Sequence, residues 1–471
     1  QGRMAKTSSN SWWVIAIAGL GLGCSKPSEP VTPAAPTQPP SAGMPVQPQA
    51  GNGTTPPAPA DAGIRTQPVD AGTTITPPPA AGSGSAGTAV SMNQTAGMPS
   101  AGAAGLPAAG QPAAGAGVPS TSTAGVGPAE DKPLGYGRMT TGGGKAQPKA
   151  ASTLAELQAA IDAYSGSGGL VLEYGGRFDF KTISDPCTQH TRDAQKLEIK
   201  NKSDISLIGK EGSAANFGIH VAGDSHNIII RNMTLGLLPG GGDSDMISLE
   251  GMSGGAPRDV WIDHNELFSS LADCPGAGDT AFDGMIDIKK GADNVTISYN
   301  YLHDHHKASL NGYSDDDSQA RHVTFHHNVF ENIGSRTPLQ RHGSSHVLNN
   351  VFSKVLVSAV NVRMQGHALI EGNHFQDVKN PVTARDSDEV GFWDLRDNNL
   401  KTAADVAPGN AFGITWDDGN KGTLNATQWT TTKAFPEQLG YTYQAQPFAC
   451  VHAGLRAVAG AGKKLATLTC K

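Results

Sequence analysis

Two groups of charged side chains in the middle of the chain are suited to chemistry, and the first consists mainly of carboxylates. Asp243 and Asp245 are two residues apart, and Asp283, Asp287 and Lys289 follow at even spacing. On an extended strand, side chains at even spacing point to the same face. Several carboxylates together suit Ca²⁺ better than zinc. Spacing alone leaves two equal alternatives, a calcium site and a set of unrelated surface aspartates.

The second group is basic and consists of Lys307, Arg336, Arg341 and Arg363. Arg336 and Arg341 flank Pro338, so they should lie at an irregular strand entry rather than on a helix. Cations beside calcium-binding carboxylates imply an anionic ligand that bridges the metal and the basic side chains. Any one of these residues could be an ordinary solvated charge, but that explanation is weaker for the combination.

The elements that must position these groups are short strands that end in asparagine. Apolar residues two apart precede six such residues, namely Asn232, Asn265, Asn300, Asn328, Asn350 and Asn373. Intervals of 22 to 35 residues suit the coils of a parallel β-helix, and the shortest are too short for a propeller blade. Stacked coils would align the asparagines in an amide ladder. A jelly roll or sandwich is the alternative, but it does not explain a periodic asparagine.

One helix precedes these strands, and four cysteines lie among or after them. Thr153 and Glu156 form a capping box before apolar residues at helical spacing. The four cysteines allow three disulfide connectivities, and none of them forms a CxxC pair. Proximity in sequence favours one staple near the C-terminus, and the other two cysteines would then tie two loops. The four are Cys187, Cys274, Cys450 and Cys470.

The composition divides the chain into three parts. Residues 1–24 have a short apolar run that ends at Gly23 and Cys24, which suits a signal peptide with a cysteine that resembles a lipid-acylated one. Residues 25–132 are rich in Pro, Gly, Ala, Ser and Thr, so we expect a disordered linker. Residues 133–471 have globular composition. We therefore expect an exported protein that is secreted or anchored at the bacterial cell surface through Cys24, its only membrane attachment.

The net charge argues against one class of partner. Thirty-five basic and 42 acidic residues give −7, whereas a nucleic-acid binder needs a basic surface. We expect no nucleic-acid partner and a monomeric chain.

Several motifs resemble pectate lyases of polysaccharide lyase family 1. They are the VWIDH segment 260–264, the strand 283–289, the segments 298–307 and 335–341, and the segment 361–373. The resemblance extends from about Gly135 to the C-terminus and implies an all-β fold, a right-handed parallel β-helix with a short N-terminal capping helix and a C-terminal extension. It also implies two disulfides, Cys187–Cys274 and Cys450–Cys470.

The resemblance implies a role for each charged residue of the two groups. Asp243, Asp245, Asp283 and Asp287 fall on calcium-ligand positions, with Asp283 where one subset of the family has Glu. Arg336 falls on the proposed catalytic base. Lys289, Lys307, Arg341 and Arg363 fall on residues that contact the carboxylates of the substrate.

The implied activity is calcium-dependent cleavage of α-1,4-linked polygalacturonate by β-elimination, which yields 4,5-unsaturated oligogalacturonates. The C5 proton lies beside the C6 carboxylate, so calcium and Lys307 would stabilise the charge that develops when the proton leaves. Arginine is ordinarily protonated, so a base role for Arg336 predicts activity that rises above neutral pH. The general acid is not visible in the sequence.

Two other functions remain as alternatives. A pectin lyase acts on methyl-esterified chains and would not need the four aspartates. A non-catalytic β-helix that binds polysaccharide at the cell surface would tolerate loss of Arg336.

Other polar motifs are expected to be structural. The histidines between 303 and 327 would split between strand faces, the Asp263–His264 pair would form structural hydrogen bonds, and residues 315–317 would be a solvated loop tip.

Overall fold

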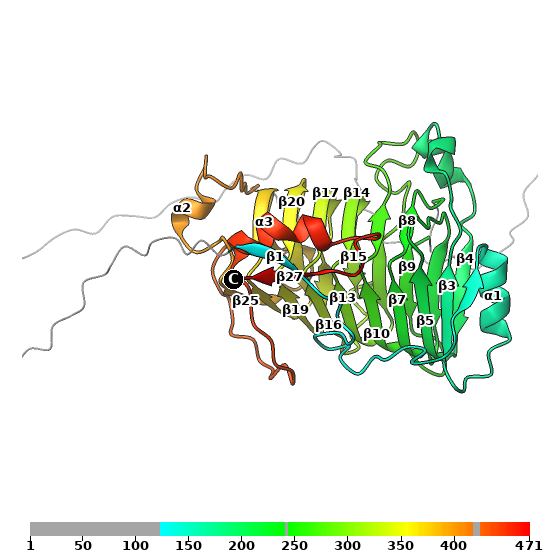
Figure 1. The fold of residues 1–471 in the computed structure, drawn as a ribbon. Helices are drawn as coiled ribbons and strands as arrows, with labels where there is room; N and C mark the ends of the chain where they lie inside the picture. The colour runs from blue at the N-terminus through cyan, green and yellow to red at the C-terminus, as the bar shows by residue number, and fades with distance from the viewer. Residues whose placement is uncertain (1–122, 241–243, 418–423) are drawn as a thin grey trace, which may run out of the picture. The chain divides into compact units, whose positions relative to one another are not determined.

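The computed structural model describes residues 123–240, 244–417 and 424–471. In these ranges the chain coils into a parallel β-helix whose strands form three long sheets (Figure 1). The fold class predicted from the sequence is thereby confirmed.

Each coil contributes strands to the sheets in a fixed order. The ten-stranded sheet contains β2 (Lys149–Ala151), β3 (Leu170–Tyr174), β5 (Ser203–Gly209), β7 (His226–Arg231), β10 (Arg258–Asp263), β13 (Asp293–Ser298), β16 (His322–His326), β19 (Ser344–Leu348), β22 (His367–Glu371) and β25 (Phe392–Arg396). The six-stranded sheet contains β8 (Thr234–Gly236), β11 (Glu266–Phe268), β14 (Tyr301–Lys307), β17 (Val329–Ser335), β20 (Val351–Val355) and β23 (His374–Val378).

The third sheet has nine strands and carries four of the predicted site residues, Asp287, Lys289, Arg341 and Arg363. It contains β4 (Lys196–Lys200), β6 (Gly218–Ala222), β9 (Ile247–Glu250), β12 (Ile286–Lys289), β15 (Ser309–Asn311), β18 (Leu339–Arg341), β21 (Val360–Arg363), β24 (Val382–Ser387) and β26 (Leu424–Thr427). All of its pairings are parallel except the one between β24 and β26.

The core fills the inside of the coils because alternate side chains of each strand point inward. Phe330, Phe352 and Phe375 occupy equivalent places in successive coils, and their rings stack with centroids 5.2 and 4.8 Å apart. Each such buried side chain contributes roughly 1.5–3 kcal/mol of hydrophobic stabilisation. The same alternation turns every second side chain outward, where it is available for a ligand.

An asparagine ladder runs along the corner between the ten-stranded and six-stranded sheets, as predicted. In each step the side-chain amide donates to the next asparagine at 2.9 or 3.0 Å, along Asn265, Asn300, Asn328, Asn350, Asn373 and Asn398. The prediction that Asn232 belongs to the ladder is wrong. Met233 takes the place one coil before Asn265, and its backbone N–H donates to the Asn265 side chain. Asn232 instead donates to the carbonyl of Gly209.

Helices and a pair of antiparallel strands cover one end and one side of the coil. Helix α1 (Leu154–Asp162) has the predicted capping box, with the Thr153 hydroxyl accepting from Glu156 N–H, and buries Leu157 and Ile161. Helix α3 (Phe448–Val458) packs near the asparagine corner and lies across the six-stranded sheet (Figure 1). A short helix, α2 (Ala403–Val406), and two 3₁₀ turns, Phe180–Thr182 and Pro186–Thr191, complete the helical elements of the described chain.

The two expected disulfides are present. Cys450–Cys470 ties α3 to β27 (Thr467–Cys470), and Cys187–Cys274 joins two loops whose sulfur atoms lie beside Phe282. Strand β27 pairs with β1 (Ala124–Gly127), which lies inside the segment expected to be linker. The small residues of β1 show no apolar periodicity, because its place depends on backbone hydrogen bonds to β27 rather than on a buried face.

Candidate functional site

The outer face of the nine-stranded sheet aligns residues from different coils in two columns. Asp287 on β12 pairs in register with Ser248 and Leu310, and Lys289 pairs with Glu250. Further along the sheet, Arg341 on β18 is aligned with Arg363 on β21. The inward neighbours Ile286 and Ile288 are buried in the core. Period-two alternation therefore turns the acidic and basic side chains of these strands outward together.

The predicted carboxylates meet where β9 and β12 begin. The Asp245 carboxylate accepts hydrogen bonds from Lys289 Nζ at 2.7 Å and from Gly284 N–H at 3.1 Å. Asp283 accepts from the backbone N–H of Ser244 at 3.2 Å. The fourth predicted ligand, Asp243, lies outside the described residues. Three of the four predicted ligands thus lie on two neighbouring coils.

Gly284 lets the carboxylates approach one another. A Cβ atom at this position would lie 2.8 Å from Asp245 Oδ1 and closer still to Asp287 Oδ1. Both oxygens therefore face the bare Cα of Gly284. A side chain here would enter the space between the two carboxylates.

Among the described carboxylates of this group, Asp287 has the environment that most disfavours its negative charge. Burial raises the pKa of its carboxyl group well above the usual value, and the negative charges of Asp245 and Asp283 raise it further. Lys289 and Arg336 act in the opposite direction. Asp287 Oδ1 is buried and has no hydrogen-bond partner among the described residues. A buried carboxylate oxygen without a partner, beside two other carboxylates, fits a cation ligand.

The carboxylates do not form a complete metal centre by themselves. Across residues 123–240, 244–417 and 424–471, no three His, Cys, Asp or Glu side chains converge closely enough to hold a metal ion. Lys289 Nζ forms an ion pair with one carboxylate oxygen of Asp245. Burial lowers the pKa of Lys289, but Asp245 and Asp287 outweigh this and raise it overall, so the ammonium is charged.

Lys307 and Arg336 flank the carboxylates from the edge of the six-stranded sheet. Lys307 ends β14 and is aligned with Ser335 on β17, so Arg336 follows directly on the next coil. Arg336 has a left-handed backbone (φ +64°), and its carbonyl accepts from Ser309 N–H at 2.7 Å. Neither side chain has an ion pair or hydrogen bond with another residue of the described ranges. The charge of Arg336 nevertheless lowers the pKa of both Asp287 and Arg363.

Arg341 and Arg363 have different surroundings although they are neighbours in the column. Arg341 Nε donates to Asp315 at 2.6 Å, and Nη1 donates to the carbonyl of Gly312 at 3.1 Å. Arg363 is buried, and burial followed by the charge of Arg341 lowers its pKa to about 9. Its Nε has no hydrogen-bond partner among the described residues. Arg363 therefore has an unused N–H donor for an incoming anion, whereas Arg341 already donates to Asp315 and Gly312.

Two residues at the site were not predicted to act there. Asp315, expected in a solvated loop tip, pairs with Arg341, and Asp317 from the same loop is buried against Arg321 at 2.9 Å. The solvated-tip prediction is wrong for both residues, because the loop folds back onto the sheet. The sequence gives little indication of these contacts, since three consecutive aspartates also suit a surface loop.

His305 was assigned a structural role, and the structure gives it a specific one. Its Nε2–H donates to the carbonyl of Asp283. Burial lowers its pKa to about 3, so the ring is neutral and holds the backbone of a predicted ligand. His305 is aligned with the apolar residue Ile333. A polar residue at an inward position was the signal that could have identified it.

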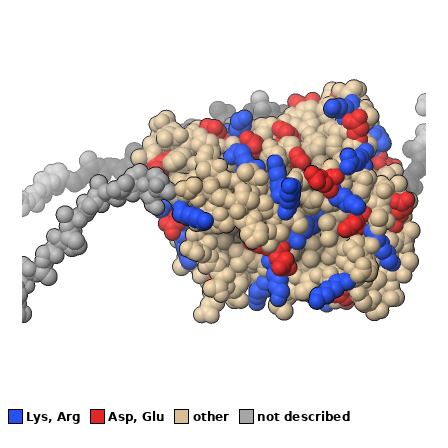
Figure 2. Space-filling model, viewed as in Figure 1, with Lys and Arg blue, Asp and Glu red and all other residues tan. Residues whose placement is uncertain are grey.

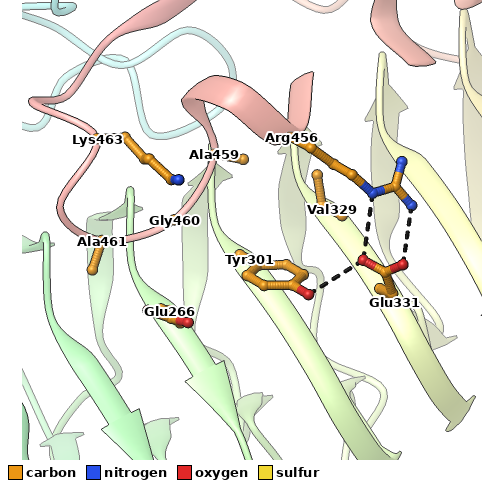
Figure 3. Close-up of a pocket in the computed structure, with 9 residues that line it drawn as sticks. All are labelled: Glu266, Tyr301, Val329, Glu331, Arg456, Ala459, Gly460, Ala461 and Lys463. Atoms are coloured by element: carbon orange, nitrogen blue, oxygen red, sulfur yellow. Dashed lines mark hydrogen bonds and ion pairs between the residues drawn. The ribbon is translucent and has the colours of Figure 1, made fainter. Parts of the chain in front are cut away.

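A separate pocket of about 270 Å³ lies between the six-stranded sheet and the chain around α3 (Figure 3). Arg456 and Tyr301 both contact Glu331 in this pocket, at 3.4 and 3.2 Å. None of the predicted site residues lines this pocket. On the face that Figure 2 shows, basic and acidic side chains are interspersed and neither sign dominates. The nine-stranded sheet therefore remains the candidate site.

Comparisons with known proteins identify the family of the chain. The family model for pectate lyase matches residues 122–464. Pectate lyase B of Dickeya chrysanthemi is 42% identical over 311 residues, which cover 64% of this chain and 80% of that protein.

Solved structures show the same likeness. Pectate lyase II from Xanthomonas campestris pv. campestris is 53% identical, with a TM-score of 0.68 over 71% of this chain and 100% of that chain. Pectate lyase C from Erwinia chrysanthemi, solved at pH 9.5 with 30 mM Ca²⁺, is 38% identical, with a TM-score of 0.66 over 71% and 97% of the two chains. A variant of pectate lyase C in complex with pentagalacturonic acid is 36% identical, with a TM-score of 0.65 over the same shares. The chain belongs to the pectate lyase family and is an enzyme, a polysaccharide lyase.

Proposed function

We propose that the protein is a calcium-dependent pectate lyase that cleaves α-1,4-linked polygalacturonate by β-elimination and releases 4,5-unsaturated oligogalacturonates. Family membership supports the reaction class, and the relative in complex with pentagalacturonic acid supports the substrate class. The observation that carries the proposal is the buried Asp287 carboxylate, which has an unpartnered oxygen and lies beside a column of cations.

Asp245, Asp283, Asp287 and Asp243 would hold the calcium ion. The chemistry of the donor set fits, because hard oxygen ligands suit Ca²⁺ and a divalent cation offsets the mutual repulsion of buried carboxylates. A relative solved with calcium supports the same choice of metal. When bound, calcium would neutralise and polarise a carboxylate of the substrate.

The cations of this chain would bind and orient the polyanion. Arg341 and Arg363 present guanidinium groups two coils and three coils beyond β12, and both suit bidentate binding of uronate carboxylates. Lys289 would help to orient a carboxylate at the coil of Asp287. Lys307 would stabilise the negative charge that develops when the proton at C5 is removed.

Arg336 is our candidate for the group that takes the C5 proton. Its side chain has no competing ion pair with a described residue, and its backbone is held by the hydrogen bond to Ser309. Neutral guanidine is needed for this role, so we expect activity to rise above neutral pH.

The decisive experiment follows the ultraviolet absorbance of the conjugated 4,5-unsaturated uronate with the full chain and polygalacturonate at mildly alkaline pH. We expect a rise that chelator abolishes and calcium restores. A chelator-resistant rise on methyl-esterified substrate would indicate a pectin lyase. Binding without any rise in absorbance would indicate a polysaccharide-binding surface protein instead.

We also propose that the protein is exported. The predicted signal segment 1–24, with Cys24 as the lipidation site, lies outside the described residues, as does most of the predicted linker 25–132. No helix in the described ranges is long and apolar enough to cross a membrane. Labelling of cells with a radioactive fatty acid would test acylation, and Cys24→Ser should remove the label.

A further inference from the structure

Arg341 and Arg363, aligned on neighbouring strands, form what we call the cation column. A carboxylate of the protein itself lies at the end of this column, beside Arg363. Asp386, on the last parallel strand β24, has a side chain that is 59% exposed. Its Oδ2 atom lies 3.8 Å from Arg363 Nη2 and 3.3 Å from Arg385 Nε. Asp386 therefore lies between the basic residue of β21 and the basic residue of β24.

The backbone around Asp386 is fixed rather than loosely attached. Residues 386–390 fold back over the end of β21, where Arg363 forms an antiparallel bridge with Val390. Met364 N–H donates to the carbonyl of Glu389 at 2.7 Å, and the Ser387 hydroxyl donates to the same carbonyl. These backbone contacts thus fix the segment that carries the Asp386 carboxylate.

The contact between Asp386 and Arg363 is close enough for attraction but too long for a hydrogen bond. Arg363 keeps an unpartnered Nε, although its side chain is only 10% exposed. Burial and the neighbouring Arg341 disfavour its charge, and Asp386 favours it. Asp386 thus supplies a counter-charge while donors of Arg363 remain for another carboxylate.

We propose that Asp386 sets how far the substrate can bind along the sheet at this end. It occupies the place that a uronate carboxylate would take at the coil of Arg385, and its negative charge repels the next galacturonate unit beyond Arg363. Strands repeat every ~4.8 Å along the sheet, so a polyanion lying along the column meets one coil after another. The inference rests on the proposed function, since it takes polygalacturonate to lie along Arg341 and Arg363.

The test measures affinity as a function of chain length. Calorimetric titration of the full chain with oligogalacturonates from trimer to octamer, with calcium and in an Arg336→Lys background that slows turnover, gives the length at which affinity stops rising. Asp386→Asn is compared with Asp388→Asn, which removes the same charge two residues away. Asp388 is exposed and has no ion pair with a described residue. Asn tolerates the left-handed backbone of Asp386 (φ +55°), so the fold should persist.

We expect Asp386→Asn to shift the plateau to longer oligomers and to raise their affinity by about 10-fold, as is typical of one removed like-charge contact. Asp388→Asn should leave the plateau in place. An unchanged plateau in Asp386→Asn, an equal gain in Asp388→Asn, or weaker trimer binding in Asp386→Asn would overturn the inference alone. Failure of the background protein to bind any oligomer would overturn the proposed substrate as well.

Discussion

The asparagine corner and the outer face of the nine-stranded sheet use buried polar groups in opposite ways. At the corner, each interior asparagine is saturated, and none of the six ladder residues has an unpartnered buried atom. On the outer face, Asp287 Oδ1 and Arg363 Nε are both buried and unpartnered among the described residues. The six ladder asparagines therefore have partners for their buried side-chain atoms, whereas these two charged groups of the outer face do not.

This difference indicates that one region of the repeating fold serves stability and the other serves function. A saturated buried network stabilises and specifies the structure, whereas an unsatisfied buried group costs free energy unless a ligand completes it. The corner should therefore respond to mutation through folding, and the outer face through binding and turnover. Four experiments test whether the two regions respond in these different ways.

The largest expected effect is on turnover. Arg336→Lys keeps the positive charge but changes the group that would take the proton, and we expect kcat to fall by about 10³-fold, within the range for a lost general base. The thermal midpoint should stay within the error of the wild type, because the side chain has no ion pair with a described residue. Continuous ultraviolet assay and a thermal melt measure the two quantities. A comparable loss of oligogalacturonate affinity would contradict a purely catalytic role.

The next largest effect is expected from the corner. Asn328→Ala removes a side chain that accepts from Asn300 and donates to Asn350 and to the carbonyl of Ile297. We expect the free energy of unfolding to fall by roughly 3 kcal/mol, because buried partners lose their hydrogen bonds.

Asn398→Ala at the end of the ladder is the matched comparison. It should cost less, since this residue donates to the Ile370 carbonyl and has no further rung beyond it among the described residues. Urea unfolding measures both variants. Equal losses of unfolding free energy at the two positions would show that an interior ladder residue contributes no more than a terminal one. A lower kcat in folded Asn328→Ala would show that the corner also affects turnover.

Acid should destabilise the fold through buried histidines beside the asparagine corner. His327 and His374 flank ladder asparagines, and burial lowers the pKa of each to about 4. Between pH 6.5 and 4 the unfolded chain binds protons that the folded chain does not, so stability falls as the pH falls. We expect a loss of about 2 kcal/mol per histidine between pH 7 and pH 5. Urea midpoints across this range measure it. A His374→Gln variant should show a shallower slope, and an identical slope would exclude His374 as a source.

The smallest effect is expected at the carboxylates. Gly284→Ala places a methyl group against Asp245 and Asp287, and we expect calcium affinity to fall by about 10-fold, equivalent to roughly 1.4 kcal/mol. Gly175→Ala is the control, because a Cβ there has no neighbour nearer than 3.6 Å. Calcium titration calorimetry compares the two. Unchanged affinity in Gly284→Ala would remove Asp245 and Asp287 from the proposed calcium site.

The repeating part of the fold could be read from the sequence because a coil has a period. Alternating apolar residues and spaced asparagines gave the coils, and the one error was a shift of one residue at Asn232. There, Ile228, Ile229 and Ile230 are consecutive and hide the alternation, so only the tertiary register shows that Met233 takes the ladder position.

The candidate site was predictable in its residue types but not in its contacts. The outward positions of Asp287, Lys289, Arg341 and Arg363 follow from strand alternation. The ion pair of Lys289 with Asp245 and the contacts of Asp315 and Asp386 do not, because they join turns of unequal length that have no repeat. The specific contact of His305 does not follow from strand alternation either, since its partner is a backbone carbonyl 22 residues away.

The stacking of coils also has an evolutionary consequence. Successive ladder residues from Asn328 to Asn398 are separated by 22, 23 and 25 residues, and in a solenoid each coil contacts mainly the coils on either side of it. Duplication or loss of a whole coil would therefore lengthen or shorten the outer face by one rung while leaving the other rungs in register. Such a change alters the reach along a polymer in discrete steps, without redesign of the residues where bonds are broken.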